Sequence, residues 1–182
     1  MRIDRLTSKL QIAISDAQSI AVGLDHNLIE PTHLIIALLE QEGSSARPIF
    51  EKAGANLANL NEALRAHLVR IATIENHDGD VQMSNDFGRL LNMADKFSQK
   101  RGDQFITTES ILLAAVDDKG EIARIFKQAG LNTECIEKAV DQVRGGEKVT
   151  DVNAEDVRQA LDRYTIDLTE RAERGTLWHC CD

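Results

Sequence analysis

The sequence lacks the motifs of several large functional classes. No GxxxxGK[ST] segment occurs in its 182 residues, so ATP hydrolysis of the usual kind has no site here. The patterns GxSxG, HExxH and CxxC are absent as well. No apolar run approaches the roughly 20 residues of a membrane-spanning helix, and the opening MRIDRLTSKL has no apolar region of a secretory signal. We therefore expect no enzyme activity of its own, no cofactor and no metal.

Cysteine, proline and aromatic residues are all scarce. The three cysteines are Cys135, Cys180 and Cys181, and an odd number with two adjacent at the C-terminus is no disulfide framework. A reducing, cytoplasmic location is the natural interpretation. Two prolines and 4% aromatic residues favour helices over sheet. A net charge of −9 argues against nucleic acid and anionic membranes as partners.

The histidines give no sign of a metal site, because none of the five has a ligand-like spacing to another. His33 lies beside an apolar helix face and is expected to be a partly buried structural residue. His179 with Cys180 and Cys181 could bind a thiophilic metal, but a tail without function is the preferred interpretation. Cys135 is expected to be a small, partly buried side chain.

What the sequence does contain is a duplication. Residues 29–54 read IEPTHLIIALLEQEGSSARPIFEKAG, and residues 106–130 read ITTESILLAAVDDKGEIARIFKQAG. The copies align at an offset of 77 (106 − 29), and of 76 (126 − 50) after a one-residue deletion. A repeat of this length is a supersecondary unit that buries its apolar faces together with its copy.

Helical periodicity runs through both copies. The first stripe has apolar side chains every three or four residues: Leu6, Leu10, Ala13, Ala17 and Ile20. Helix starts are expected at residues suited to the first position or the cap, and stops at glycines. The expected starts are Pro31, Ser44 or Ser45, Asn56, Ser84, Thr107 or Thr108, and Thr133, and the expected stops include Gly23, Gly54, Gly102, Gly130 and Gly145. No strand-type alternation is convincing.

The sequence therefore predicts an all-α fold of two pseudo-repeats, each of four helices, over residues 1–148. Residues 149–182 are expected to form a linker and a C-terminal helical segment, with the helical pattern over 155–175 and an atypical tail, TLWHCCD, from 176.

The acidic segment KRGDQFITTES, residues 100–110, has two interpretations. Glu109 in the first turn of a helix can compensate the helix dipole, with Asp103 serving a neighbouring helix end. Alternatively, Asp103 and Glu109 form an exposed acidic rim beside an apolar groove where a peptide docks. The pair Leu90 and Leu91 is either core or part of that groove.

Four separated segments carry a resemblance to a known family. MRIDRLTSKLQ, IEPTHLIIALL, KRGDQFITTE and RQALDRYTIDLTERAERG occur in the order found in the N-terminal domain of bacterial ClpB disaggregase chaperones, and the resemblance covers roughly residues 1–175. It implies an all-α domain joined by a mobile linker to two ATPase rings in a hexamer. Such a domain helps to capture unfolded or aggregated polypeptide.

The resemblance also implies which residues bind. A surface patch of the family matches Thr7, Asp103 and Glu109, and Leu91 is the candidate for its apolar part. In the family, the segment ending at Gly175 continues into the first ATPase domain, whereas here TLWHCCD follows. We expect the isolated chain to be a monomer that binds substrate without ATPase activity. Two alternatives stay open: an adaptor-docking domain of the ClpA or ClpC type, and a fragment of an enzyme whose catalytic domain is missing.

Overall fold

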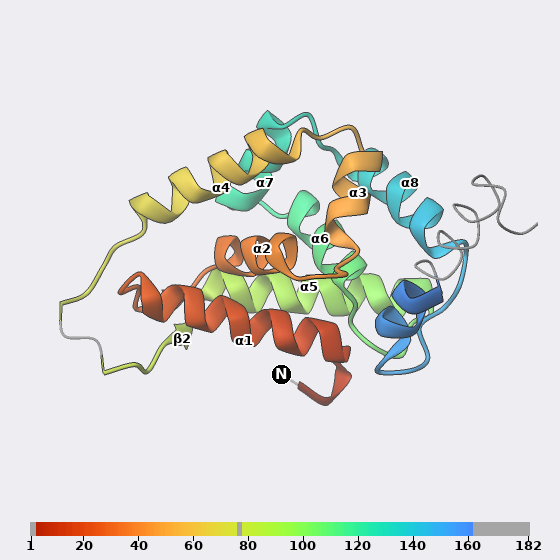
Figure 1. Cartoon of the computed structure of the whole chain (residues 1–182), viewed down its shortest axis with the longest axis horizontal. Helices are drawn as coiled ribbons and strands as arrows, with labels where there is room; N and C mark the ends of the chain where they lie inside the picture. Colours follow the sequence, from red (N-terminus) through yellow and green to blue (C-terminus); the bar gives the residue numbers. More distant parts are fainter. Residues whose placement is uncertain (1–2, 76–77, 162–182) are drawn as a thin grey trace, which may run out of the picture.

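The computed structural model describes residues 3–75 and 78–161 and confirms an all-α fold of two pseudo-repeats (Figure 1). A short 3-10 helix, Ile3–Arg5, precedes the first repeat. That repeat comprises α1 (Ser8–Gly23), α2 (Pro31–Glu40), α3 (Ala46–Lys52) and α4 (Leu57–Arg70). The second comprises α5 (Asn85–Arg101), α6 (Thr108–Asp117), α7 (Glu121–Gln128) and α8 (Thr133–Arg144).

The two repeats are related by an approximate twofold arrangement. In each, the first two helices pack on one another, α1 on α2 and α5 on α6. The last two helices pack across: α3 lies on α8, and α4 lies on α7. Phe50 of α3 and its repeat equivalent Phe126 of α7 meet edge to face, with ring centroids 5.3 Å apart and both side chains fully buried. Neither repeat has a core of its own, because the buried apolar residues form one continuous cluster.

Short parallel pairings join the segments that enter the helices. β1 (Leu28–Ile29), before α2, pairs with β2 (Gln82–Met83), before α5. In the equivalent place, Leu6 before α1 bridges Ile106 before α6, and the Thr7 N–H donates to the Ile106 carbonyl at 3.1 Å. The sequence predicted no strands, since a two-residue strand is too short to show alternation. The second pairing sets the N-termini of α1 and α6 next to each other.

Most predicted helix boundaries are confirmed. Asn56, Ser84 and Thr107 each accept a backbone N–H in the following helix, and Gly102 ends α5 in the left-handed conformation at φ 77°. The predicted cap Thr133 is wrong by one residue: Asn132 caps α8 by accepting the Cys135 N–H at 2.8 Å. The two neighbours are both good cap residues, and the spacing alone does not separate them.

The chain after α8 returns to the domain. Val149 is buried, and its carbonyl accepts the Gln104 N–H at 2.8 Å. The Val152 carbonyl accepts the Ser8 N–H at 2.9 Å. Residues 154–161 are helical. The part of the predicted linker that the structure describes therefore packs on the repeats, and the predicted boundary at 148 stays a prediction. The rest of the predicted helical segment and the tail from 176 lie outside the described residues.

His33 is a structural residue of the core, as its position beside an apolar helix face predicted. It is fully buried, where the sequence predicted partial burial. The Glu30 N–H donates to its Nδ1 at 2.8 Å, and its Nε2 lies 2.8 Å from Nδ1 of His26. Burial, with the neighbouring His26, lowers the pKa of His33 to about 4. Within the described ranges, no three or more His, Cys, Asp or Glu side chains are grouped so as to hold a metal ion. No helix in these ranges is long and apolar enough to span a membrane.

The shared core predicts that the two repeats unfold together. Phe126→Ala should lower the free energy of unfolding of the whole chain by about 3–5 kcal/mol, because it leaves a cavity where the repeats meet. Val69→Ala, at a side chain that is 87% exposed, is the control and should change it by about 0.5 kcal/mol or less. Calorimetry should show one transition in all variants. Two separate transitions, with only the second repeat destabilised by Phe126→Ala, would contradict a shared core.

Candidate functional site

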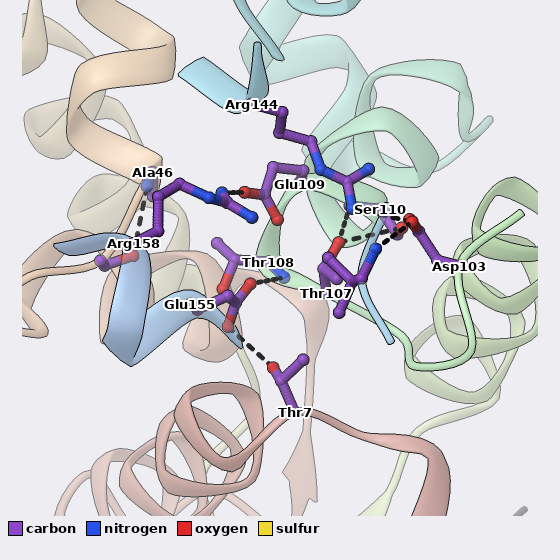
Figure 2. Close-up of polar contacts among 12 residues, drawn as sticks. Thr7, Ala46, Asp103, Thr107, Thr108, Glu109, Ser110, Arg144, Glu155 and Arg158 are labelled. Atoms are coloured by element: carbon purple, nitrogen blue, oxygen red, sulfur yellow. Dashed lines mark hydrogen bonds and ion pairs between the residues drawn. The ribbon is translucent and has the colours of Figure 1, made fainter. Parts of the chain in front are cut away.

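Polar side chains from both repeats and from the C-terminal segment meet at the N-terminus of α6 (Figure 2). We call this group the α6 cluster: Thr7, Asp103, Thr108, Glu109, Arg144, Glu155 and Arg158. All of them except Arg158 are at most 6% exposed. Such a concentration of buried polar groups is expensive unless each group is paired, so the contacts of each decide what the cluster can do.

Glu109 lies in the first turn of α6 with a fully buried carboxylate, paired with the guanidinium of Arg158. Burial by itself would raise the pKa of Glu109, but the positive charges of Arg158 and Arg144 outweigh it and hold that pKa below its ordinary value. The N-terminal end of the α6 dipole favours the same negative charge. Glu109 is therefore an anion inside the protein, and Arg158 is the cation that makes this possible.

Glu155 approaches the same helix end from the C-terminal segment. Its Oε1 accepts the backbone N–H of Thr108 at 2.8 Å, and its Oε2 accepts the hydroxyl of Thr7 at 2.7 Å. Burial, and then the nearby charge of Glu109, raises the pKa of Glu155 to about 8. Glu155 therefore keeps a proton at neutral pH, which removes the repulsion between two buried carboxylates.

Asp103 holds the chain where it leaves α8. Its Oδ1 accepts hydrogen bonds from Nη2 of Arg144 and from the N–H of Val149, both at 2.9 Å. The side chains of Asp103 and Arg144 are 0% and 2% exposed. This ion pair and the Val149 bond fix residues 145–149 against the loop after α5, and so direct the C-terminal segment towards α6.

The structure brings together three of the four residues predicted to bind. Thr7, Asp103 and Glu109 all lie in the α6 cluster. The expectation that Asp103 and Glu109 form an exposed acidic rim is wrong in this conformation, because residues 149–161 cover them. Leu91 is 1% exposed and lies within the apolar core.

The sequence analysis missed Arg144, Glu155 and Arg158. Each charge makes its contact far along the chain: Arg144 pairs with Asp103 and Arg158 with Glu109, separations of 41 and 49 residues. The available signal was Glu155 and Arg158 three residues apart in a helical pattern, which puts both on one face. That signal alone does not name the surface that the face meets.

The α6 cluster is not saturated. Within the described part of the chain, several of its buried atoms have no hydrogen-bond partner: Asp103 Oδ2, Thr108 Oγ1, Glu109 Oε2, Arg144 Nε and Arg158 Nε. A buried polar atom left without a partner costs about 1–3 kcal/mol. These atoms have no hydrogen-bond partner within the described part of the protein.

At the equivalent helix end, the described part of the first repeat has buried histidines, His26 and His33, where the second has buried ion pairs. The repeat equivalent of Glu109 is Thr32 (109 − 77), whose hydroxyl lies 2.8 Å from Nδ1 of His67. A groove of about 360 Å³ opens there, lined by residues that include Thr32, Arg70 and Asp118. The two repeats therefore share a fold but differ in charge at the place where each could bind.

Comparisons with known proteins place this geometry in a family. The model of the Clp repeat (R) N-terminal domain matches residues 5–129. The chaperone protein ClpB of Pseudomonas putida is 52% identical over 177 residues, which is 97% of this chain and 21% of that protein. ClpB of Vibrio vulnificus is 50% identical with the same coverage. The chain thus spans about a fifth of the length of these relatives.

Solved structures show the same fold at low identity. The N-terminal domain of Hsp104 from Candida albicans superposes with a TM-score of 0.72 at 23% identity, covering 82% of this chain and 98% of that one. A complex of a ClpV N-domain with a VipB peptide gives 0.63 at 19% identity, covering 81% and 92%. The chain belongs to the Clp repeat (R) N-terminal domain family and is about half identical to the N-terminal region of ClpB chaperones.

Proposed function

We propose that this chain is the substrate-binding domain of a ClpB-like disaggregase and that it binds unfolded or aggregated polypeptide weakly in the cytoplasm. One observation carries the proposal: a segment of polypeptide, residues 149–161, already lies on Thr7, Asp103 and Glu109. A surface that accepts both backbone and side-chain groups of its own chain has the chemistry to accept those of another. The sequence identity of 52% to a ClpB chaperone, over 97% of this chain, supports the proposal.

The binding chemistry follows from the α6 cluster. Asp103 accepts a backbone N–H, Glu109 binds a cation, and the Thr108 N–H at the end of α6 donates to a carboxyl oxygen. Each of these groups taken singly recognises a kind of chemical group that many sequences supply, which suits a domain that meets many clients. Weak binding also suits transfer, because several such domains on one hexamer would gain affinity through effective concentration. Leu91, buried in this conformation, stays a sequence-based prediction for the apolar part.

A second candidate is docking of an adaptor or other folded partner. The solved complex of a ClpV N-domain with a VipB peptide shows that a domain of this fold can carry a bound partner peptide. The groove at Thr32 and Arg70 offers a separate place for such a partner. Titration with a folded partner against a permanently unfolded protein separates the two functions, since only capture of clients requires affinity for unfolded chains.

The proposed site predicts the outcome of an NMR titration with a permanently unfolded protein. The dissociation constant should lie between roughly 10 μM and 1 mM, the range of small transient contacts. The largest shifts should occur at Thr7, Asp103 and Glu109. Glu109→Gln should weaken binding about tenfold, because it removes the anion while keeping the side-chain shape. Glu134→Gln, at an exposed pair with Lys138, is the control and should bind as the unchanged chain does. No shifts at millimolar polypeptide would reject the site.

The absence of a phosphate-binding loop predicts that this chain alone neither binds nor hydrolyses ATP. Added in excess to a complete ClpB-type enzyme, it should slow reactivation of an aggregated protein, because it occupies the segments that the enzyme needs. The measurement is recovery of activity against increasing concentration of the chain, with ATP turnover of the chain followed separately. Turnover by the chain alone would overturn the non-enzyme assignment, and faster reactivation would point to a different role.

A further inference from the structure

We propose that residues 149–161 are an intramolecular ligand of the rest of the α6 cluster, namely Thr7, Asp103, Thr108, Glu109 and Arg144, and compete with client polypeptide for these residues. The site therefore prefers, in a client, a helical segment with glutamate followed three residues later by arginine. This inference rests on the proposed function, since it names which segments the polypeptide-binding site prefers and what controls access to it.

Two ionisable residues of the segment, Glu155 and Arg158, act together on one helix end. Glu155 and Arg158 lie on one face of the helical residues 154–161, since positions three apart are neighbours on a helix surface. Glu155 accepts hydrogen bonds from the Thr108 N–H and from the Thr7 hydroxyl, while Arg158 forms an ion pair with the carboxylate of Glu109. The face thus offers an acceptor and a cation, and the helix end offers a donor and an anion. Figure 2 shows this complementary pairing.

Backbone bonds bring the segment into register. The Val149 N–H donates to Asp103, the Ser8 N–H donates to the Val152 carbonyl, and the Ser8 hydroxyl donates to Oδ1 of Asn153 at 2.6 Å. These bonds use peptide groups or short polar side chains, which any client can supply. The selective part of the ligand is therefore the glutamate and arginine pair, since Arg158 matches the buried charge of Glu109 and Glu155 matches the two donors beside it.

The segment is held in a way that allows release. Val149 at its start is buried, at 1% exposed, but the large apolar side chains of its helical part do not support it: Val157 is 56% exposed and Leu161 is 61% exposed. The side-chain amide of Gln159 packs directly against Gly43, where an added Cβ would come within about 2 Å of that amide. A cavity of about 430 Å³ also lies beneath it, lined by Lys9, Pro48 and Lys52 among others. Docking of the helical part, residues 154–161, is therefore mainly polar.

Docking should respond to pH, because burial, and then the nearby charge of Glu109, raises the pKa of Glu155. Facing it are Glu109 from α6, Arg158 from its own segment and, behind Glu109, Arg144 from α8; Lys9 of α1 and Glu147 lie nearby. The pKa of Glu155 is raised from 4.5 to about 8, so docking takes up a proton and weakens as pH rises from about 4.5 towards about 8. Glu109 acts in the opposite sense. Because its pKa is lowered, it favours docking at every pH above its ordinary pKa, and this contribution is lost only in acid.

The test uses the full chain and four variants, with the state of the segment read from the NMR shifts of residues 149–161. Arg158→Ala should release the segment, because Glu109 loses its cation. Glu155→Gln should keep the segment docked and remove the dependence on pH between 5 and 8, because the amide replaces the protonated acid. Arg124→Ala, at an exposed pair with Glu121, is the matched control and should change neither property. Lys9→Ala tests whether the second nearby cation holds the segment instead of Arg158.

The affinity for a permanently unfolded protein should rise about threefold or more in Arg158→Ala, since the free fraction of the site sets the apparent dissociation constant. A synthetic peptide of residues 149–161 should bind Arg158→Ala at Thr7 and Glu109 and displace the unfolded protein. The same peptide with Glu155 and Arg158 exchanged should bind at least tenfold more weakly. Equal affinity of the unfolded protein for the unchanged chain and Arg158→Ala, with the segment released, would contradict this inference alone. Binding of the peptide with no binding of the unfolded protein by any variant would contradict the proposed function and the competition with it.

Discussion

The structure depends on the fact that each repeat leaves an apolar face that only the other repeat can cover. Phe50 and Phe126, which are equivalent in the two copies, meet where those faces join. The last two helices of each copy then cross onto the other, α3 onto α8 and α4 onto α7. The same arrangement pairs the segments before α1 and α6, so that Thr7 and Thr108 lie at one place. The position of the candidate site is therefore a consequence of how the core is shared.

The duplication explains the fold, and the difference between the copies explains the site. Glu109 is an anion in the second repeat where the first has Thr32. A fully buried carboxylate needs a cation beside it, and in the described part of the chain Arg158 pairs with it directly while Arg144 adds a second charge. One of these cations comes from outside the repeats. In this structure the charge of Glu109 is thus balanced by a cation that residues 149–161 bring to it.

Much of the fold could be predicted because it is encoded locally. Apolar spacing and cap residues such as Asn56, Ser84 and Thr107 mark helix starts within a few residues of sequence. The error at Asn132 arose between two adjacent cap residues. The two-residue strands were missed because pairing, and not local pattern, defines them.

The site was predicted less well because it depends on distant contacts. The family resemblance supplied Thr7, Asp103 and Glu109, and the structure brings them together. The burial of Asp103 and Glu109 could not be read from residues 100–110, since the groups that pair with them, Arg144 and Arg158, lie more than 40 residues away. A charged residue in a loop is usually solvated, and only the partner across the chain reverses that expectation.

The central claim is that one surface holds residues 149–161 and client polypeptide in turn. The most direct measurement is hydrogen exchange at the Val149 N–H, which donates to Asp103, without and with a saturating permanently unfolded protein. The account predicts slow exchange in the free chain and much faster exchange when polypeptide is bound, while the helix amides of α6 stay protected. Unchanged protection of Val149 at saturation would show that the polypeptide binds elsewhere and would contradict the account.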